Sequence, residues 1–351
     1  MPSAIPRKAT PPTLRDIARL AGVSHTTVSL SLRNDPSIPE ATRQRVRTVA
    51  DQAGYRSNVL VSALMTQVRL QHHKTTPEVV GFLTGGPSAD EWKNHSANVG
   101  FFEGARSRAP GLGIRVEPFW LGPGGAAAGA ACRMLHSRAI RGVLIAPFAV
   151  PVYAFELDWP RLICVGLGYV YNDHPLHRAT HNHFRGAFTA YENLVRLGYR
   201  RIGLMLDPDQ NRRVNFSWLG GFLAAQSTLS DVRLEPLLVN ETNGIAPVKA
   251  WLRRSRPDAM VGFGPGQYLT LQLAGRRIPE DLAYAALDVE QMHLARVADA
   301  AGINQNLPRV GATGVDTLAT LLYHNEQGLA EHPVLSMIEG HWTDGATAPG
   351  A

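Results

Sequence analysis

The sequence has few cysteines and no long apolar run, and both features narrow the class of protein. Cys132 and Cys164 are the two cysteines among 351 residues, so neither a disulfide framework nor a CxxC metal site is expected. No run approaches the roughly 20 apolar residues that a membrane-spanning helix needs. Residues 1–12 contain Arg7 and Lys8 but lack the apolar segment of a secretory signal. We therefore expect a cytoplasmic protein that does not contact a membrane.

Sequence motifs of common enzyme classes are also missing. The chain contains no G-x-S-x-G elbow and no H-E-x-x-H. Two glycine-rich stretches, GPGGAAAG and GFGPGQ, lack the lysine of a phosphate-binding loop. Asp207 and Asp209 form a carboxylate pair at the end of an expected strand, where turn formation is a more ordinary role than acid–base catalysis. No catalytic residue, no cofactor and no enzymatic activity are predicted.

A cluster of four histidines is the strongest candidate for a metal site. His174, His177, His181 and His183 lie within ten residues, and neutral imidazole is a common metal ligand. However, only Asp173 adds a carboxylate at this place, and no cysteine does. We therefore expect the rim of a pocket or a solvated loop here, and no metal.

Positive charge is concentrated at the start of the chain. Residues 1–70 contain ten Lys/Arg and four Asp/Glu, whereas residues 71–351 contain twenty-five of each. Such an asymmetry is typical of a small module that meets a polyanion and is joined to a neutral body. The apolar fraction of 44% is high enough for folded cores in both parts. A basic tail without a partner is the alternative.

The N-terminal module has the pattern of three short helices. Apolar residues at 14, 17, 18 and 21 lie on one helical face, and Thr13 with Asp16 has the spacing of a capping box. Gly22 suits a helix end, and Ser24 is placed to begin a second helix with Val28 and Leu32 inward. A third helix is expected over residues 40–53. The pattern predicts a helix-turn-helix, whose second helix enters the major groove with small hydroxyl side chains; a solvated three-helix bundle is the alternative.

Two stretches of this module, TLRDIARLAGVSHTTVSLSLRN and IPEATRQRVRTVADQAGYRSN, resemble the DNA-binding headpiece of the lactose-repressor (LacI/GalR) family of bacterial transcription regulators. The resemblance implies that His25 and Thr26 read bases. It implies phosphate contacts for Thr13, Ser24, Thr27, Ser29, Tyr55 and Asn58. Arg33 is expected to strengthen binding to any sequence. The family often has Arg at the position of Leu30, so Leu30 is expected to pack on a thymine methyl group.

Residues 58–77 are predicted to form a hinge helix and linker between the headpiece (residues 1–57) and the body. Apolar residues at 61, 64, 65 and 68 share a helical face, but so short a helix is marginal without a packing partner. In the resembled family, this helix pairs with its copy in the partner subunit over the minor groove. Leu64 stands at the position of the leucine that is inserted between base pairs. An ordinary amphipathic linker is the alternative.

The body, residues 78–345, alternates short apolar runs with helical stretches, which favours βαβ units and parallel sheets. A midpoint near residues 168–180 divides it into two α/β lobes. Further stretches, among them HNHFRGAFTAYENLVRLGYRRIG and RIPEDLAYAALD, resemble the periplasmic-binding-protein-like effector domain of the same regulators. Residues 346–351 are expected to be a disordered tail. The predicted fold is thus an all-helical headpiece and hinge followed by a two-lobed α/β effector domain.

Ligands of such folds bind beyond the carboxyl ends of the strands, in the cleft between the lobes. Departures from the family pattern, such as Trp218 in place of an arginine, leave the identity of the ligand open. The tryptophan either packs on the apolar face of a sugar ring or fills the space that a ligand would occupy. The residues expected to line the effector site are Gly85, Phe148, His181, Asn182, Trp218, Asp288 and Gln305.

The function predicted from these features is sequence-specific regulation of transcription, as a repressor, by a nucleoid-associated homodimer. Its expected partners are a DNA operator and a small-molecule effector of the sugar type. The operator would be near-palindromic, because a dimer with two-fold symmetry binds DNA with two-fold symmetry. Three alternatives remain open at this point: a ligand-independent regulator with a filled cleft, a sugar-binding protein, and a sugar-active enzyme on the same scaffold.

Overall fold

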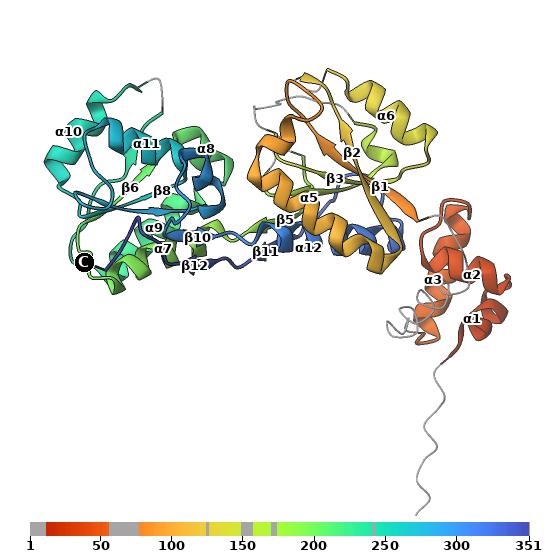
Figure 1. The fold of residues 1–351 in the computed structure, drawn as a ribbon. Helices are drawn as coiled ribbons and strands as arrows, with labels where there is room; N and C mark the ends of the chain where they lie inside the picture. The colour runs from red at the N-terminus through yellow and green to blue at the C-terminus, as the bar shows by residue number, and fades with distance from the viewer. Residues whose placement is uncertain are drawn as a thin grey trace, which may run out of the picture.

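The computed structural model describes residues 12–55, 77–123, 126–148, 157–169, 174–240 and 243–350. It shows a small helical headpiece followed by a body of two lobes (Figure 1). The headpiece helices are α1 (Leu14–Ala21), α2 (His25–Leu32) and α3 (Glu40–Gln52). They enclose a core of Ile17, Ala21, Val28, Val46 and Ala50. The three helices predicted for this module are confirmed, and the third ends one residue before its predicted boundary.

The first lobe is built on a six-stranded sheet in which every pairing is parallel. Its strand order is β11-β5-β4-β3-β1-β2. The strands are β1 (Glu78–Thr84), β2 (Ile114–Trp120), β3 (Gly142–Ile145), β4 (Ile163–Leu167), β5 (His177–His181) and β11 (Leu335–Ile338). The helices of this lobe are η1 (Glu91–Asn94), α5 (Ser96–Arg108), η2 (Ala109–Leu112), α6 (Ala128–Ser137), η4 (Trp159–Arg161) and α12 (Leu307–His324).

The second lobe repeats this plan with strand order β12-β10-β9-β8-β6-β7, in which only the β10–β12 pairing is antiparallel. Its strands are β6 (Ile202–Leu206), β7 (Leu237–Leu238), β8 (Ala259–Gly262), β9 (Ala283–Ala286), β10 (Gly302–Asn304) and β12 (His341–Thr343). Its helices are α7 (His183–Arg196), α8 (Pro208–Arg213), α9 (Ser217–Leu229), α10 (Ala246–Ser255), α11 (Pro265–Leu273) and η6 (Val289–Ala295). The predicted parallel α/β architecture is confirmed.

Each sheet has an apolar core on both faces because successive strand residues point to opposite sides. In β1, Phe82 belongs to the core shared with α5 and α12, whereas Leu83 belongs to the core shared with α6. In β6, Leu204 and Met205 divide in the same way between the two cores of the second lobe. Cys164 is buried in the first lobe as a free thiol, and burial raises its pKa.

Close helix contacts hold each lobe together. A Cβ atom on Gly311 of α12 would lie 2.0 Å from the carbonyl oxygen of Phe101 in α5. In the second lobe, a Cβ atom on Gly221 of α9 would lie 2.1 Å from the carbonyl oxygen of Phe184 in α7. Only glycine lets these backbones approach so closely.

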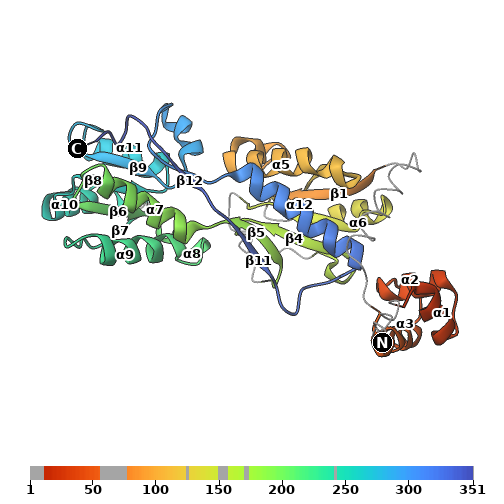
Figure 2. The ribbon, with the colours of Figure 1, turned by 90° about the horizontal axis from the view of Figure 1, so that it is seen from below.

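The chain passes between the lobes three times, after β5, after β10 and after β11. The first passage, at residues 181–183, follows directly on the predicted midpoint. Figure 2 shows α12 and β11, both late in the chain, lying in the first lobe beside β5. Three connections at one place make the contact zone between the lobes a hinge region.

The C-terminal residues differ from the prediction of a disordered tail. Thr347 and Ala348 are buried. The Thr347 hydroxyl donates to the Tyr284 carbonyl (2.7 Å) and accepts from the Ala301 amide (2.9 Å), while the Tyr284 amide donates to the Thr347 carbonyl (2.7 Å). The prediction was wrong for residues 346–350 because this segment of small residues is held by hydrogen bonds to β9 and to the residue before β10, which composition does not reveal.

Candidate nucleic-acid interface and inter-lobe cleft

The turn between α1 and α2 is fixed by local side chains. The Thr13 amide and hydroxyl both donate to the Asp16 carboxylate, at 2.9 and 2.7 Å, and complete the predicted capping box. These hydrogen bonds from Thr13 lower the pKa of Asp16. Gly22 ends α1 with φ of 64°. The Ser24 hydroxyl then accepts from the Thr27 amide (3.0 Å) and begins α2, which orients this helix against the other two.

Helix α2 presents its first turn to solvent. Ser24, His25 and Thr26 are exposed, and Thr27, Ser29 and Leu30 are half-buried along the same helix. On the inner side Val28 is fully buried, as expected, but the second buried residue is Ser31, whereas Leu32 is only half-buried. Leu32 still packs against the headpiece core, which agrees with its expected inward place, and the structure adds Ser31 to the inner side, one turn after Val28.

Several arginines surround this surface without a carboxylate partner. Arg19 lies 3.7 Å from Asp16, and Arg43 pairs with Glu40. In contrast, Arg15, Arg45 and Arg47 make no salt bridge with any residue that the structure describes. Unneutralised guanidinium groups beside an exposed helix are the electrostatic requirement for contact with phosphates.

Arg33, another predicted DNA contact, faces the body in this arrangement. The Arg33 guanidinium lies 5.4 Å from the centre of the Tyr323 ring at the end of α12. The neighbouring Asn34 carbonyl accepts from the Asn325 side chain (3.1 Å). Tyr55 packs against the headpiece core, and burial raises its pKa. Asn58 and Leu64, together with the predicted hinge helix, lie outside the described residues, and their roles stay predictions.

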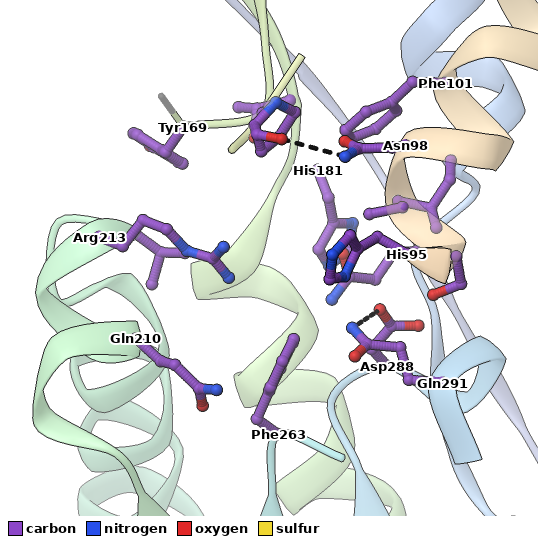
Figure 3. A pocket seen from close by; sticks show the side chains of 18 of the residues that line it. His95, Asn98, Phe101, Tyr169, His181, Gln210, Arg213, Phe263, Asp288 and Gln291 are labelled. Atoms are coloured by element: carbon purple, nitrogen blue, oxygen red, sulfur yellow. Dashed lines mark hydrogen bonds between the residues drawn. The ribbon is translucent and has the colours of Figure 1, made fainter. Parts of the chain in front are cut away.

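A cleft of about 260 Å³ lies between the two lobes. Five of the predicted effector residues line it: Phe148, His181, Trp218, Asp288 and Gln305. Figure 3 shows side chains from both lobes converging on this space. Four of the five lie at or just after the end of a strand, whereas Trp218 lies in α9. Their contact with a ligand stays a prediction.

Two predicted effector residues do not line the cleft. Asn182 caps α7: its side-chain oxygen accepts from the Arg185 amide (3.0 Å), and its side-chain nitrogen donates to Glu339 (2.9 Å). Gly85 lies beneath Phe148, so that a Cβ atom there would come within 2.5 Å of the Phe148 ring. Both residues lie behind the wall of the cleft in this structure, and their contact with an effector stays a prediction.

Trp218 belongs to the wall of the cleft. It is 1% exposed, and its ring centre lies 4.8 Å from that of Phe263 and 5.1 Å from that of His183. Gln305 is held in place because its side-chain nitrogen donates to the Leu287 carbonyl (2.8 Å). The tryptophan therefore gives this wall of the cleft an aromatic surface.

Burial changes the ionisation of the polar residues in the cleft. Asp288 is 1% exposed, and burial raises its pKa to about 6 even though Gln291 donates to it at 2.7 Å. Burial also lowers the pKa of His181 to about 4 and places that of His183 well below its ordinary value. Both imidazoles are thus neutral at pH 7 and able to donate and accept hydrogen bonds.

The four clustered histidines have three different environments. The His174 ring packs against that of Trp159 with centres 4.5 Å apart, and His177 accepts from the Val334 amide (3.2 Å). His181 ends β5 and His183 begins α7, and both reach the cleft. Within the described part of the chain, no three His, Cys, Asp or Glu side chains are grouped as metal ligands.

Asp207 has the turn role expected for it. Its carboxylate accepts from the amides of Asp209 (2.8 Å) and Gln210 (3.0 Å) at the start of α8.

Sequence reasoning missed other residues that line the cleft and lie on helices and loops after the strands: His95, Ser96, Asn98, Tyr169, Gln210, Arg213, Phe263 and Gln291. The position of some of these residues could have indicated them, because Asn98 and Gln210 lie in the first turn of a helix that follows a strand.

The structure thus combines a helix-turn-helix headpiece with a two-lobed α/β body that contains a cleft. Residues 13–58 match the family model described as bacterial regulatory proteins, lacI family. Among curated relatives, the "Probable HTH-type transcriptional repressor ExuR" of Bacillus subtilis (strain 168) is 47% identical over 16% of this chain and 16% of its own length. The matched segment thus spans about a sixth of that relative. The regulator CelR of Thermobifida fusca is 25% identical over 94% of this chain and 96% of its own length.

Solved structures share the whole fold. A CelR–cellobiose complex has a TM-score of 0.57 at 20% identity, and the match covers 96% of this chain and 99% of that one. A lac repressor dimer bound to operator and the anti-inducer ONPF has a TM-score of 0.53 at 20% identity, with 97% and 100% covered. The match to the lacI family thus covers the headpiece, and the whole chain shares the fold of these two solved structures.

Two further expectations concern enzymatic activity and membrane-spanning helices. These relatives are named as regulators or repressors, which agrees with the expectation that the chain is not an enzyme. No helix among the described residues is long and apolar enough to span a bilayer.

Proposed function

We propose that the chain is a transcription repressor that binds operator DNA through its headpiece and responds to a small molecule in the inter-lobe cleft. The observation that carries this proposal is the exposed first turn of α2, with Ser24, His25 and Thr26 open to solvent in a domain that matches the lacI family. Small polar side chains on an exposed helix beside unpaired arginines suit a DNA groove. Such a protein acts at the chromosome in the bacterial cytoplasm.

The repressor works as a homodimer on a near-palindromic site. One headpiece offers a single recognition helix of eight residues, which covers too few base pairs for specific binding alone. Two copies related by a two-fold axis read two half-sites about one helical turn apart. A lac repressor solved as a dimer on its operator, with the same fold as this chain, supports this arrangement.

The effector is of the sugar type and binds between the lobes. The lining combines aromatic rings, Trp218 and Phe263, with the polar groups of Asp288 and Asn98, as sites for polyhydroxy compounds require. The relative solved with cellobiose supports this class. Binding would change the angle between the lobes, and hence the spacing of the segments that precede them in the two subunits.

Selection from a random DNA library tests the DNA-binding part. The full-length protein is used to enrich duplexes from a pool with a randomised 24-base-pair stretch. The expected product is a family of two-fold symmetric sequences, whose binding weakens steeply with salt. Recovery of asymmetric or unenriched sequences would overturn the proposal.

A regulator that binds DNA without an effector is the second candidate, because the fully buried Trp218 occupies part of the space between the lobes. A melting-temperature screen against sugars separates the two candidates. A ligand at about 100 times its Kd stabilises the folded state by about 2.7 kcal/mol, so an effector raises the melting temperature by several degrees and changes operator affinity. A regulator with a filled cleft shows neither effect.

A further inference from the structure

The charged residues of the cleft are few and lie on different sides of it. Among the described lining residues, Arg213 is the only lysine or arginine and Asp288 the only carboxylate. Figure 3 shows Arg213 reaching into the space from the end of α8, with Asp288 and Gln291 across the cleft from it. A ligand that spans the cleft therefore meets a cation at one end and hydrogen-bond acceptors at the other.

Helix α8 separates the roles of two adjacent arginines. Arg212 points away: its side chain is 68% exposed and lies 2.6 Å from Asp209. Arg213 is half-buried and lines the cleft, between Gln210 one turn earlier and the fully buried Val214. A guanidinium that faces an enclosed, partly apolar space favours an anion there, and its planar donors match carboxylate or phosphate oxygens in pairs.

The opposite end is arranged for hydroxyl groups. The Asp288 carboxylate accepts from the Glu290 amide (3.1 Å) and the Gln291 side chain (2.7 Å). Each carboxylate oxygen keeps a second lone pair that can accept from a ligand hydroxyl. The Asn98 side-chain nitrogen donates to the Pro147 carbonyl (3.0 Å), while its buried oxygen has no hydrogen-bond partner among the described residues.

The two buried histidines lie between these ends. Nδ1 of His183 is buried without a hydrogen-bond partner among the described residues, and the His181 ring lines the cleft beside the backbone of Ile338. Leaving such atoms unpaired costs free energy, and ligand hydroxyls would satisfy them. Because both rings are neutral, Arg213 remains the cationic group that lines the described cleft.

We propose that the effector is an anionic polyhydroxy compound of about monosaccharide size, whose carboxylate or phosphate binds Arg213 and whose hydroxyls bind Asp288, Asn98 and the histidines. The inference rests on the proposed effector function of the cleft and names the ligand class within it. The cleft volume of about 260 Å³ is close to the lower end of ligand pockets, at about 300 Å³, which favours a single ring.

Calorimetric titration of the full-length protein tests this assignment. The probes are matched sets of a hexose, its hexuronate and its 6-phosphate in the gluco, galacto and manno configurations, with inorganic phosphate as a further probe. We expect one charged member to bind at least tenfold more tightly than its neutral hexose, and the comparison of uronate with phosphate ester identifies the anionic group. Equal or tighter binding of the neutral hexose would overturn the inference, as would the failure of every charged probe to bind.

Two adjacent variants provide the matched comparison. Arg213→Gln is expected to weaken binding of the charged ligand by about 10- to 100-fold, as the loss of charge-assisted hydrogen bonds predicts, and to leave the neutral hexose unaffected. Arg212→Gln, which changes an exposed arginine of the same helix, is expected to have no effect. Equal losses in both variants contradict the assignment, and so does inorganic phosphate alone binding as tightly as the sugar acid.

The outcome also separates this inference from the proposed function. If a neutral sugar binds the cleft and changes operator affinity, the result supports the proposed regulator and contradicts the anionic effector. If the charged ligand binds through Arg213 but the protein enriches no DNA sequence, the result supports the anionic ligand class and contradicts the proposed regulator.

Discussion

The headpiece and the cleft display polar side chains in opposite ways. On the headpiece, Ser24, His25 and Thr26 are exposed and make few contacts with the rest of the protein. In the cleft, His181 and Asp288 are 3% and 1% exposed, and their pKa values have moved far from the ordinary ones. A surface that must fit a rigid DNA groove has to be open, whereas a site for a small molecule has to enclose it.

The two regions also differ in how their stability is secured. The headpiece has one core of five buried apolar residues, while each lobe has two larger cores, one on each face of its sheet. A single buried change should therefore abolish the function of the headpiece without unfolding the body. Changes in the body should act on stability and ligand binding before they act on DNA.

The largest effect is expected from Ile17→Asp. Ile17 is fully buried in the headpiece core, and a carboxylate there loses its hydration as well as the apolar contacts, at a cost above about 3–5 kcal/mol. We expect DNA binding to disappear while the melting transition of the body is unchanged, as measured by fluorescence anisotropy and circular dichroism.

Leu20→Asp is the matched control, because Leu20 belongs to the same helix and is 59% exposed. It should keep the headpiece folded. If both variants melted and bound DNA alike, the described headpiece core would be incorrect.

The next largest effect is expected from Gly311→Ala in α12. The added methyl group would meet the Phe101 carbonyl at 2.0 Å, so that the α5–α12 pair must separate, at a cost of about 3 kcal/mol by analogy with overpacked cores. The body should melt several degrees lower in calorimetry. Gly266→Ala in α11 has no atom within 4 Å of the new methyl group, and it should be neutral or slightly stabilising.

Asp288→Asn tests the ionisation of the cleft. The folded-state pKa of Asp288 is raised to about 6 from 3.8, so its charge destabilises the fold increasingly as pH rises between these values, and the full cost is present above about pH 6. The variant should therefore gain, relative to the parent protein, about 2–3 kcal/mol in free energy of unfolding between pH 4 and pH 7. Denaturant titrations at both pH values measure this difference, and a constant difference would show that Asp288 titrates normally.

The smallest effects are expected on the headpiece surface. His25→Ala should relax base preference in its half-site position, with a loss of about 1–3 kcal/mol of discrimination. Arg33→Ala should weaken binding to all sequences and reduce the salt slope by about one. Competition with duplexes that differ at single positions separates the two. An equal loss of specificity from both variants would contradict the assigned roles.

Much of the headpiece is predictable from sequence because its determinants are local. The Thr13–Asp16 box, Gly22 and Ser24 each act within four residues, and all three are confirmed. The alternation that predicts two α/β lobes is local as well. The tail over residues 346–350 was mispredicted, since its order depends on hydrogen bonds to strands far away in the chain.

The cleft is less predictable because it gathers residues from distant elements. Strand ends indicated His181 and Asp288, which line the cleft, but the Asn182 side chain caps α7. Arg213 lies at the end of a short helix, and whether it or Arg212 faces the cleft depends on the phase of that helix, which the sequence does not fix. Three-dimensional placement is therefore needed to choose between neighbours of the same type.

The most direct test of the account compares the full-length chain with a chain that begins at residue 77, on one duplex recovered by selection. Fluorescence anisotropy at about 100 mM salt gives both affinities. If the headpiece makes the DNA contacts and the lobes only regulate them, the shorter chain loses at least about a hundredfold in affinity, as the removal of the basic surface and base contacts requires. Equal affinity of the two chains would contradict the central claim.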